Sequence, residues 1–256
     1  METAVYVHVP VCRQKCRYCA FYSEPLAEVS RWLDGYLSAL EREIAMLNQR
    51  LGGMVTARTF FLGGGTPTAL DTARLERLLG VLQRGLCFPA GAEKSVEVNP
   101  GTLTARKIEL LRRFGVNRVS LGVQSFDDAV LRRIGRIHTA AQAAQGIALI
   151  RAAGFPQLDV NLDLMFGLPG QGMWEWRNSV EQALSYAPEH LSLYGLILEE
   201  GTPLGDAYAR RRAGELWDLP DEDAQADMYD WASDRLRRAG YRRYETANFA
   251  LPGREC

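Results

Sequence analysis

The chain has 256 residues, 47% of them hydrophobic and 24% charged, so it is long enough to form one large globular domain with a substantial core. Its 30 Lys and Arg side chains nearly balance 31 Asp and Glu side chains, which argues against a protein that binds nucleic acid or a membrane surface through bulk charge. No secretion signal is visible at the N-terminus, and no apolar run reaches the roughly 18 residues of a membrane span. We therefore expect a cytoplasmic protein.

Strand-like and helix-like segments alternate along the first 200 residues. Strands are predicted at residues 4–9, 58–62, 95–98, 118–121, 158–164 and 191–196. Helices are predicted at residues 31–50, 72–85, 104–113, 139–153 and 175–186. This alternation predicts parallel βα units with right-handed crossovers. An open doubly wound sheet and a closed or partial (β/α) barrel both fit this alternation. Against a dinucleotide-binding open sheet, no Gly-x-Gly-x-x-Gly motif follows the first strand. Against a full barrel, the six predicted units are fewer than the eight that a full barrel contains.

The organisation changes after the sixth predicted strand. Residues 199–222 are turn-rich and charged, a helix is predicted at 222–239, and a strand is predicted at 241–249. We expect residues 1–200 to form the main α/β domain and residues 201–256 to begin a C-terminal α/β extension.

Three of the five cysteines, Cys12, Cys16 and Cys19, lie within eight residues near the N-terminus. Thiolates this close repel one another and oxidise readily, so a soft metal or a metal cluster is the first hypothesis. Structural zinc needs four ligands, and His8 is expected to share a strand face with Tyr6 rather than turn toward the thiols. Three thiolates on a four-iron cluster leave one iron open to a small molecule. Zinc and a structural role for the thiols are the alternatives.

The string Cys12-x3-Cys16-x2-Cys19, with Tyr18 before the last cysteine, resembles the signature of the radical S-adenosylmethionine (SAM) superfamily. The resemblance implies a partial, six-unit TIM-like barrel, a 4Fe-4S cluster on these three cysteines, and SAM on the open iron. It also implies that Tyr6, which precedes the cysteines, and Tyr18, which lies between Cys16 and Cys19, are in the cofactor-binding region.

Two predicted strands end in segments that resemble SAM-binding motifs. After residues 58–62 comes Gly63-Gly64-Gly65-Thr66-Pro67, where glycines allow close approach of the backbone to a ligand, although such runs also simply form tight turns. The resemblance implies that Gly64, Gly65 and Thr66 hold the amino group of SAM. Glu97 lies in an apolar strand, where an acid needs a partner or a ligand, unless it points to solvent. The resemblance implies a SAM contact for it.

Two later strands contribute three further candidates. Gln124 ends the fourth strand, and Arg136 follows twelve residues later, the interval at which the family carries a SAM-binding Gln and Arg. Asp163 lies in the apolar fifth strand and needs hydrogen-bond donors such as a ribose diol. The family uses an Asp in this motif on SAM.

Other polar and aromatic residues have weaker claims. His138 is either a proton carrier or, more commonly for a lone histidine, a cap or surface residue. Tyr194 and Gly195 either line the cofactor cavity or pack in the core, and Met165 and Phe166 are expected in the core. Cys87 and Cys256 are expected to be packed or incidental thiols.

The longer string Tyr6-x-His8-x-Pro10-x-Cys12 resembles the branch that contains oxygen-independent coproporphyrinogen III oxidases (HemN) and heme chaperones (HemW). In the oxidases a further cysteine follows the triad, whereas this chain has Phe21, as the chaperones do. The resemblance therefore implies heme binding and delivery to acceptor proteins, some of them membrane-associated, with flavodoxin or ferredoxin as an electron donor. Oxidative decarboxylation of coproporphyrinogen III is the alternative. A further C-terminal region normally follows Tyr244-Glu245-Thr246, so the chain resembles a fragment.

Overall fold

The computed structural model describes residues 2–155, 157–210 and 218–256, and these residues form two compact units. The first unit comprises residues 1–14, 21–119 and 148–158, and the second comprises residues 15–20, 120–147 and 159–256. The expected start of the C-terminal extension at residue 201 falls inside the second unit and remains a prediction.

Three parallel strands form the main sheet of the first unit. Strand β1 (Glu2–Val9) pairs with β4 (Val55–Gly64), and β4 pairs with β6 (Glu93–Val98). The register aligns Val9 with Gly64 and Leu62 with Val96, so the carboxyl ends of these strands meet at one edge. Short strands β2 (Val11–Cys12) and β3 (Glu24–Pro25) pair with each other, and β5 (Leu86–Cys87) pairs with the start of β4.

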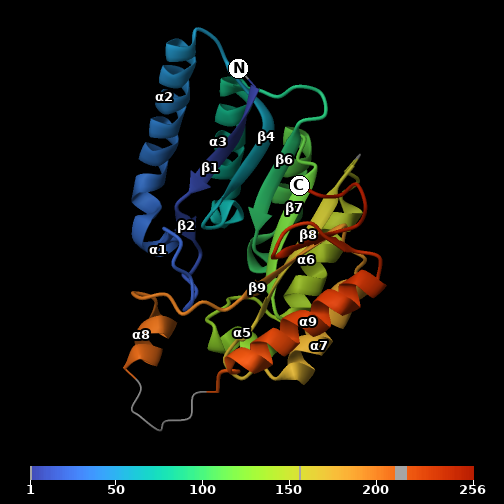
Figure 1. Ribbon diagram of the computed structural model, residues 1–256. Coiled ribbons are helices and arrows are strands. Elements are labelled where there is room, and N and C mark those ends of the chain that lie inside the picture. The colour runs from blue at the N-terminus through green and yellow to red at the C-terminus, as the bar shows by residue number, and fades with distance from the viewer. Residues whose placement is uncertain (1, 156, 211–217) are drawn as a thin grey trace. The chain divides into compact units, whose positions relative to one another are not determined.

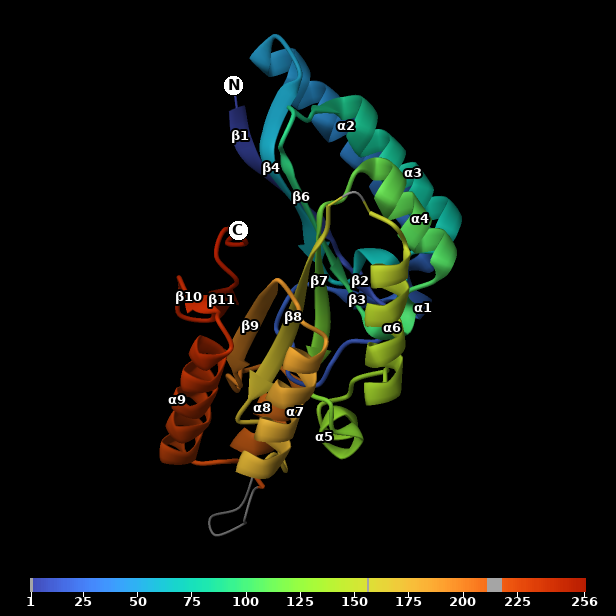
Figure 2. The ribbon, with the colours of Figure 1, turned by 90° about the vertical axis from the view of Figure 1, so that its right-hand side faces the viewer.

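Helices α2 (Leu33–Leu51), α3 (Thr72–Gly85) and α4 (Ala105–Phe114) lie on one side of these strands (Figure 2). Asp71 begins α3 by accepting a hydrogen bond from the Arg74 amide, and α2 ends at Gly52, whose positive φ of 69° favours glycine. The apolar stripe of α3, including Leu75, Leu78 and Leu82, is fully buried. Short helices complete the unit: α1 (Leu26–Val29) and the 3-10 turns Ser30–Trp32, Pro67–Ala69 and Pro100–Thr102.

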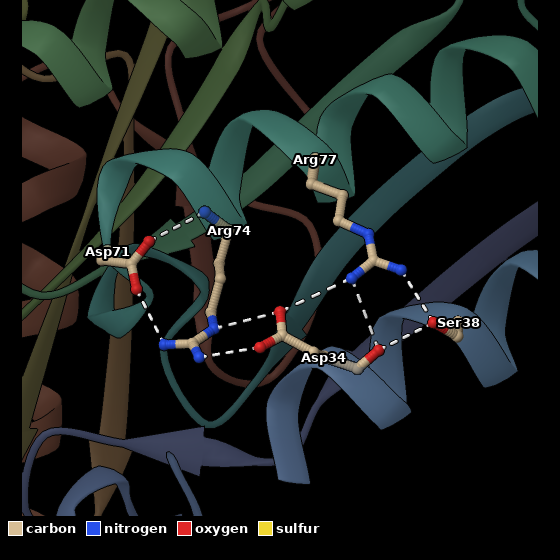
Figure 3. A network of polar contacts seen from close by, with 5 residues as sticks. All are labelled: Asp34, Ser38, Asp71, Arg74 and Arg77. Atoms are coloured by element: carbon tan, nitrogen blue, oxygen red, sulfur yellow. Dashed lines mark hydrogen bonds and ion pairs between the residues drawn. The ribbon is translucent and has the colours of Figure 1, made fainter. Parts of the chain in front are cut away.

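An exposed network of polar contacts joins helices α2 and α3 (Figure 3). The Asp34 carboxylate pairs with Arg74 at 2.9 Å and with Arg77 at 3.5 Å, and Arg77 also donates to the Ser38 hydroxyl at 2.7 Å. These guanidinium groups lower the pKa of Asp34, chiefly through the hydrogen bond from Arg74. Because the groups are exposed, the network orients the two helices more than it stabilises them.

The second unit has the strand order β7-β8-β9-β11-β10. Strand β7 (Arg118–Gln124) starts in the first unit and continues here. Strands β8 (Asp159–Phe166) and β9 (His190–Gly195) are parallel, while β11 (Asn248–Ala250) runs antiparallel to both β9 and β10 (Arg242–Arg243). The single strand predicted at 241–249 is therefore wrong, since the chain turns back within it and forms a short hairpin.

Helices α7 (Met173–Ser185) and α9 (Glu222–Arg238) pack side by side in this unit (Figures 1 and 2). The fully buried Trp176 of α7 donates its indole N–H to the Met228 carbonyl of α9 at 2.7 Å, and Arg235 of α9 pairs with Glu181 of α7. Helices α5 (Asp128–Arg133) and α8 (Pro203–Ala209) are shorter, and α6 (Ala140–Ala152) divides between the two units.

The six strands predicted before residue 200 are all present, and the α/β class is confirmed. Strand β1 has β4 as its partner and β10 has β11, so among the described strands the hydrogen bonding does not close into a barrel. No helix of the described residues is long and apolar enough to cross a membrane.

Candidate functional site

The predicted site residues fall into two groups, one in each unit. The first unit carries six of them: Tyr6, Cys12, Gly64, Gly65, Thr66 and Glu97. The second unit carries the other six: Cys16, Tyr18, Cys19, Gln124, Arg136 and Asp163.

In the first group, two backbone hydrogen bonds join the start of the cysteine loop to the glycine loop. The Gly65 amide donates to the Val9 carbonyl at 2.8 Å, and the Thr66 amide donates to the Val11 carbonyl at 2.7 Å. A Cβ at position 65 would lie 2.3 Å from the Val11 carbonyl oxygen, so no side chain fits there. These contacts hold the Cys12 thiol 3.7 Å from the Thr66 hydroxyl.

Glu97 reaches the same edge from strand β6. Its carboxylate accepts a hydrogen bond from the Gly64 amide at 3.0 Å, and Gly64 has a φ of 106° that a side chain rarely adopts. Glu97 therefore does not simply point to solvent, because it fixes the glycine loop from the neighbouring strand.

Tyr6 and His8 share one face of strand β1, as the sequence predicts. The Tyr6 hydroxyl lies 3.0 Å from His8 Nδ1, and His8 Nε2 lies 2.8 Å from the Tyr22 carbonyl oxygen. Burial, with a smaller contribution from Glu97, raises the pKa of Tyr6. Both ring nitrogens of His8 thus have partners other than a thiol.

In the second group, the turn after α5 holds the rest of the cysteine loop. The Arg17 amide donates to the Ile134 carbonyl at 3.0 Å, and a Cβ on Gly135 would lie 2.8 Å from the Arg17 side chain. Arg136 donates to the Cys16 thiol at 3.5 Å and also to the Gly122 carbonyl at the end of β7. Arg136 therefore links the cysteine loop to the end of β7.

Tyr18 packs against an apolar cluster formed by Val130, Ile134, Met165 and Leu168. Burial raises the pKa of Tyr18 well above its ordinary value, opposed by Arg136 and reinforced by the neighbouring thiols and Asp163. The ring therefore serves as a neutral wall beside Cys16 and Cys19, and Met165 is a core residue as predicted.

Gln124 has two marks of a ligand-binding residue. Its φ of 67° is rare for a residue other than glycine, and its buried Oε1 has no hydrogen-bond partner in the structure. A buried acceptor without a partner costs free energy, so this carbonyl oxygen is suited to accept from a bound ligand.

Asp163 is the acidic centre of the second group. Its carboxylate accepts from the Ser120 hydroxyl at 3.0 Å and from the Asn161 amide at 2.7 Å. Burial raises the pKa of Asp163 to about 6, while the hydrogen bonds and Arg136 oppose that rise. The carboxylate is thus mostly ionised at neutral pH and can accept from a sugar hydroxyl.

His138 is buried and serves as a structural residue. Its Nε2–H donates to the Val123 carbonyl at 3.1 Å, and burial together with Arg136 lowers its pKa to about 3. A proton carrier at neutral pH needs a much higher pKa, so the structure favours the capping interpretation.

Sequence reasoning missed a ladder of polar residues beside Asp163. The β8–β9 register aligns Asn161 with His190 and Asp163 with Ser192, which places four polar side chains along two apolar strands. His190 Nδ1 lies 2.7 Å from Asn161 Oδ1, and the Ser192 hydroxyl donates to the same oxygen at 3.2 Å. The signal that could have found them is the two-residue spacing within each strand, which puts each pair on one face.

Taken separately, each group offers chemistry that suits part of a cluster or of SAM. None of the five cysteines, all of which lie in the described residues, forms a disulfide; Cys12, Cys16 and Cys19 are partly buried, while Cys87 and Cys256 are exposed. Within residues 2–155, 157–210 and 218–256, no three His, Cys, Asp or Glu side chains converge as a preformed ion site. The glycine loop offers a backbone surface that a Cβ would block, and Gln124 offers a buried acceptor without a partner.

Comparison with known proteins gives a consistent result. The family model described as the radical SAM superfamily matches residues 6–183. The heme chaperone HemW of Lactococcus lactis is 38% identical over 252 residues, covering 98% of this chain and 63% of the relative. HemW of Bacillus subtilis is 38% identical over 253 residues, covering 98% of this chain and 64% of the relative. The chain thus spans less than two thirds of the length of these relatives.

A solved structure supports the fold along almost the whole chain. Coproporphyrinogen III oxidase (HemN) from Escherichia coli, described as a radical SAM enzyme, superposes with a TM-score of 0.85 at 29% identity. The match covers 98% of this chain and 56% of the oxidase.

Proposed function

Because this chain belongs to the radical SAM superfamily, we propose that it binds a 4Fe-4S cluster and SAM and transfers heme to acceptor proteins. Cys12, Cys16 and Cys19 would hold the cluster, and when bound the cluster and SAM supply one-electron chemistry. Gly64, Gly65, Thr66, Glu97, Gln124, Arg136 and Asp163 would hold SAM, with Tyr6 and Tyr18 beside it. Clustered thiols of this kind suit the reducing cytoplasm.

The residue that favours heme transfer over porphyrinogen oxidation as the function is Phe21. The chain has an apolar ring where the oxidases of this branch have a further cysteine, and the ring is 71% exposed. The relatives from Lactococcus lactis and Bacillus subtilis, which each match 98% of the chain, are named heme chaperones. Heme, heme-acceptor proteins and an electron donor such as flavodoxin or ferredoxin are the partners that this proposal requires.

The second candidate is oxygen-independent coproporphyrinogen III oxidase activity. It is favoured by the TM-score of 0.85 to an enzyme with that activity in its description. The residues proposed to hold the cluster and SAM suit either function. The two proposed functions differ in the further ligand, which is heme in the first and coproporphyrinogen III in the second.

One anaerobic experiment separates the candidates. The chain is reconstituted with iron and sulfide, then titrated with heme, and separately supplied with coproporphyrinogen III, SAM and a reductant. We expect a stable Soret shift with heme and no porphyrinogen turnover; turnover without heme retention would reverse the ranking. Iron and sulfide found in the reconstituted protein would exclude the zinc alternative. Cys12→Ala, Cys16→Ala and Cys19→Ala should each lose the cluster absorption. Cys87→Ala, which changes an exposed cysteine outside the triad, should retain it.

A further inference from the structure

We propose that His138 is a positioning residue for SAM, because its imidazole holds Gln124 in the backbone conformation from which the Gln124 side chain binds the cofactor. This inference rests on the proposed binding of SAM, since Gln124 is one of the residues assigned to it. All of the contacts involved lie within the second unit.

Gln124 is the central residue of a γ-turn at the end of strand β7. The Ser125 amide donates to the Val123 carbonyl at 2.9 Å, and the φ of Gln124 is 67°. A γ-turn with a positive φ at its centre is rare and strained, because the side chain of an L-residue crowds the backbone there. Such a conformation persists only where surrounding contacts hold it.

His138 supplies one of these contacts. Its Nε2 lies 3.1 Å from the Val123 carbonyl oxygen, which thus accepts hydrogen bonds from both the Ser125 amide and the imidazole. A carbonyl can only accept, so the proton of the ring is on Nε2. Burial, together with Arg136, lowers the pKa of His138 to about 3, so the ring stays neutral and keeps this donor at neutral pH.

The imidazole is costly as a packing residue. Among the described residues its Nδ1 has no hydrogen-bond partner, although His138 is only 2% exposed. A methionine or a leucine would fill the space without a buried, unpaired nitrogen. The hydrogen bond to Val123 is therefore the interaction that distinguishes the imidazole from an apolar side chain at this position.

Ser179 of helix α7 holds the other side of the turn. Its hydroxyl oxygen accepts from the Phe126 amide at 3.1 Å and lies 3.3 Å from the Ser125 hydroxyl, and both serines are fully buried. The backbone is thus held before Gln124 by His138 and after it by Ser179. Between these two contacts the strained residue carries a buried amide oxygen without a partner, as expected of a side chain held for a ligand.

The segment that carries His138 also carries Arg136, another residue proposed to hold SAM. Arg136 donates to the Gly122 carbonyl, and His138 donates to the next carbonyl, that of Val123. One segment therefore fixes the end of strand β7 through two successive carbonyls. The link from this segment to the cysteine loop is made by Arg136, through the Cys16 thiol, so removal of the imidazole should leave the cluster in place.

Binding of SAM to the anaerobically reconstituted chain, measured by calorimetry, tests the assignment. His138→Gln and His138→Met introduce side chains of similar length, but only the glutamine keeps an N–H that can replace Nε2–H. We expect His138→Met to bind SAM about tenfold more weakly with full iron content, and His138→Gln to stay within about threefold of wild type. Ser179→Ala should also weaken SAM binding, because it releases the other side of the turn.

Two measurements separate positioning from a general loss of stability. In a Gln124→Ala background, His138→Met should weaken SAM binding no further, because His138 acts through the Gln124 side chain. In the apo chain, Gln124→Gly should melt at a higher temperature than Gln124→Ala, because glycine adopts a φ of 67° without strain.

Each other result has a defined meaning. A wild-type chain that binds no SAM would refute the proposed function together with this inference. Wild-type affinity in His138→Met, or an equal loss in His138→Met and His138→Gln, would overturn the inference alone. Additive losses in the Gln124→Ala background, or loss of iron from His138→Met, would also overturn it. Circular dichroism and thermal melting establish that each variant is folded; if His138→Met does not fold, His138→Asn, whose amide is too short to replace Nε2–H, takes its place.

Discussion

The substitution Gly65→Ala tests how the glycine loop positions the first cysteine. The added Cβ would lie 2.3 Å from the Val11 carbonyl oxygen, which is a backbone atom and cannot move aside as a side chain does. The two loops must therefore separate, which weakens the bonds from the Gly65 amide to Val9 and from the Thr66 amide to Val11. Two backbone hydrogen bonds at about 1 kcal/mol each, plus about 1–2 kcal/mol of packing strain, predict a loss of about 3–4 kcal/mol in the free energy of unfolding.

The assay is urea unfolding of the apo chain, followed by iron analysis after anaerobic reconstitution. Gly53→Ala is the matched control, because a Cβ there meets nothing within 4 Å. We expect Gly65→Ala to lower both the unfolding midpoint and the iron content, because Cys12 is displaced with Val11. A variant as stable as the control, with full iron content, would refute the argument.

Three further variants test other parts of the structure. Asp163→Asn should stabilise the apo chain by about 1–3 kcal/mol at pH 7.5. Because the pKa of Asp163 is raised to about 6 in the folded chain, the wild-type chain loses free energy of unfolding as the pH rises from about 4 to 6, and the variant does not. The unfolding curves of the two proteins should therefore differ at pH 7.5 and converge at pH 4, and an equal difference at both pH values would exclude the raised pKa. The same variant should bind SAM more weakly by calorimetry. Trp176→Phe should cost about 1–3 kcal/mol by removing buried volume and the bond to the Met228 carbonyl, and an unchanged melting temperature would contradict this. Asp34→Asn should shift the unfolding midpoint only slightly, and only at low salt, because the ion pairs of Asp34 are exposed. A large shift that persists at high salt would show that these ion pairs stabilise the fold substantially.

Local patterns predicted most of the helices and strands. The helix predicted at 72–85 coincides with α3, because an Asp cap precedes it and its apolar stripe is regular. The strand predicted at 58–62 is longer in the structure, since β4 gains partners in β1, β5 and β6 that no local pattern reveals. Helix α8 lies in the segment 199–222, which the sequence predicts to be turn-rich, and Thr202 and Pro203 begin this short helix.

The candidate residues could be selected from the sequence, but their contacts could not. The resemblance to the radical SAM superfamily identified Gln124 and Asp163 as candidates, whereas the positive φ of Gln124 and the raised pKa of Asp163 depend on long-range packing. The polar ladder of Asn161, Asp163, His190 and Ser192 joins β8 and β9, and the register between two such strands is not encoded locally.

Heme transfer itself is the measurement that tests the proposed function most directly. The reconstituted chain is loaded with one equivalent of heme, separated from free heme, and mixed with apomyoglobin as a model acceptor under anaerobic conditions. We expect the Soret band to change from that of the chain to that of holomyoglobin while the iron-sulfur absorption persists. Failure to retain heme, combined with consumption of coproporphyrinogen III in the presence of SAM and reductant, would contradict the account.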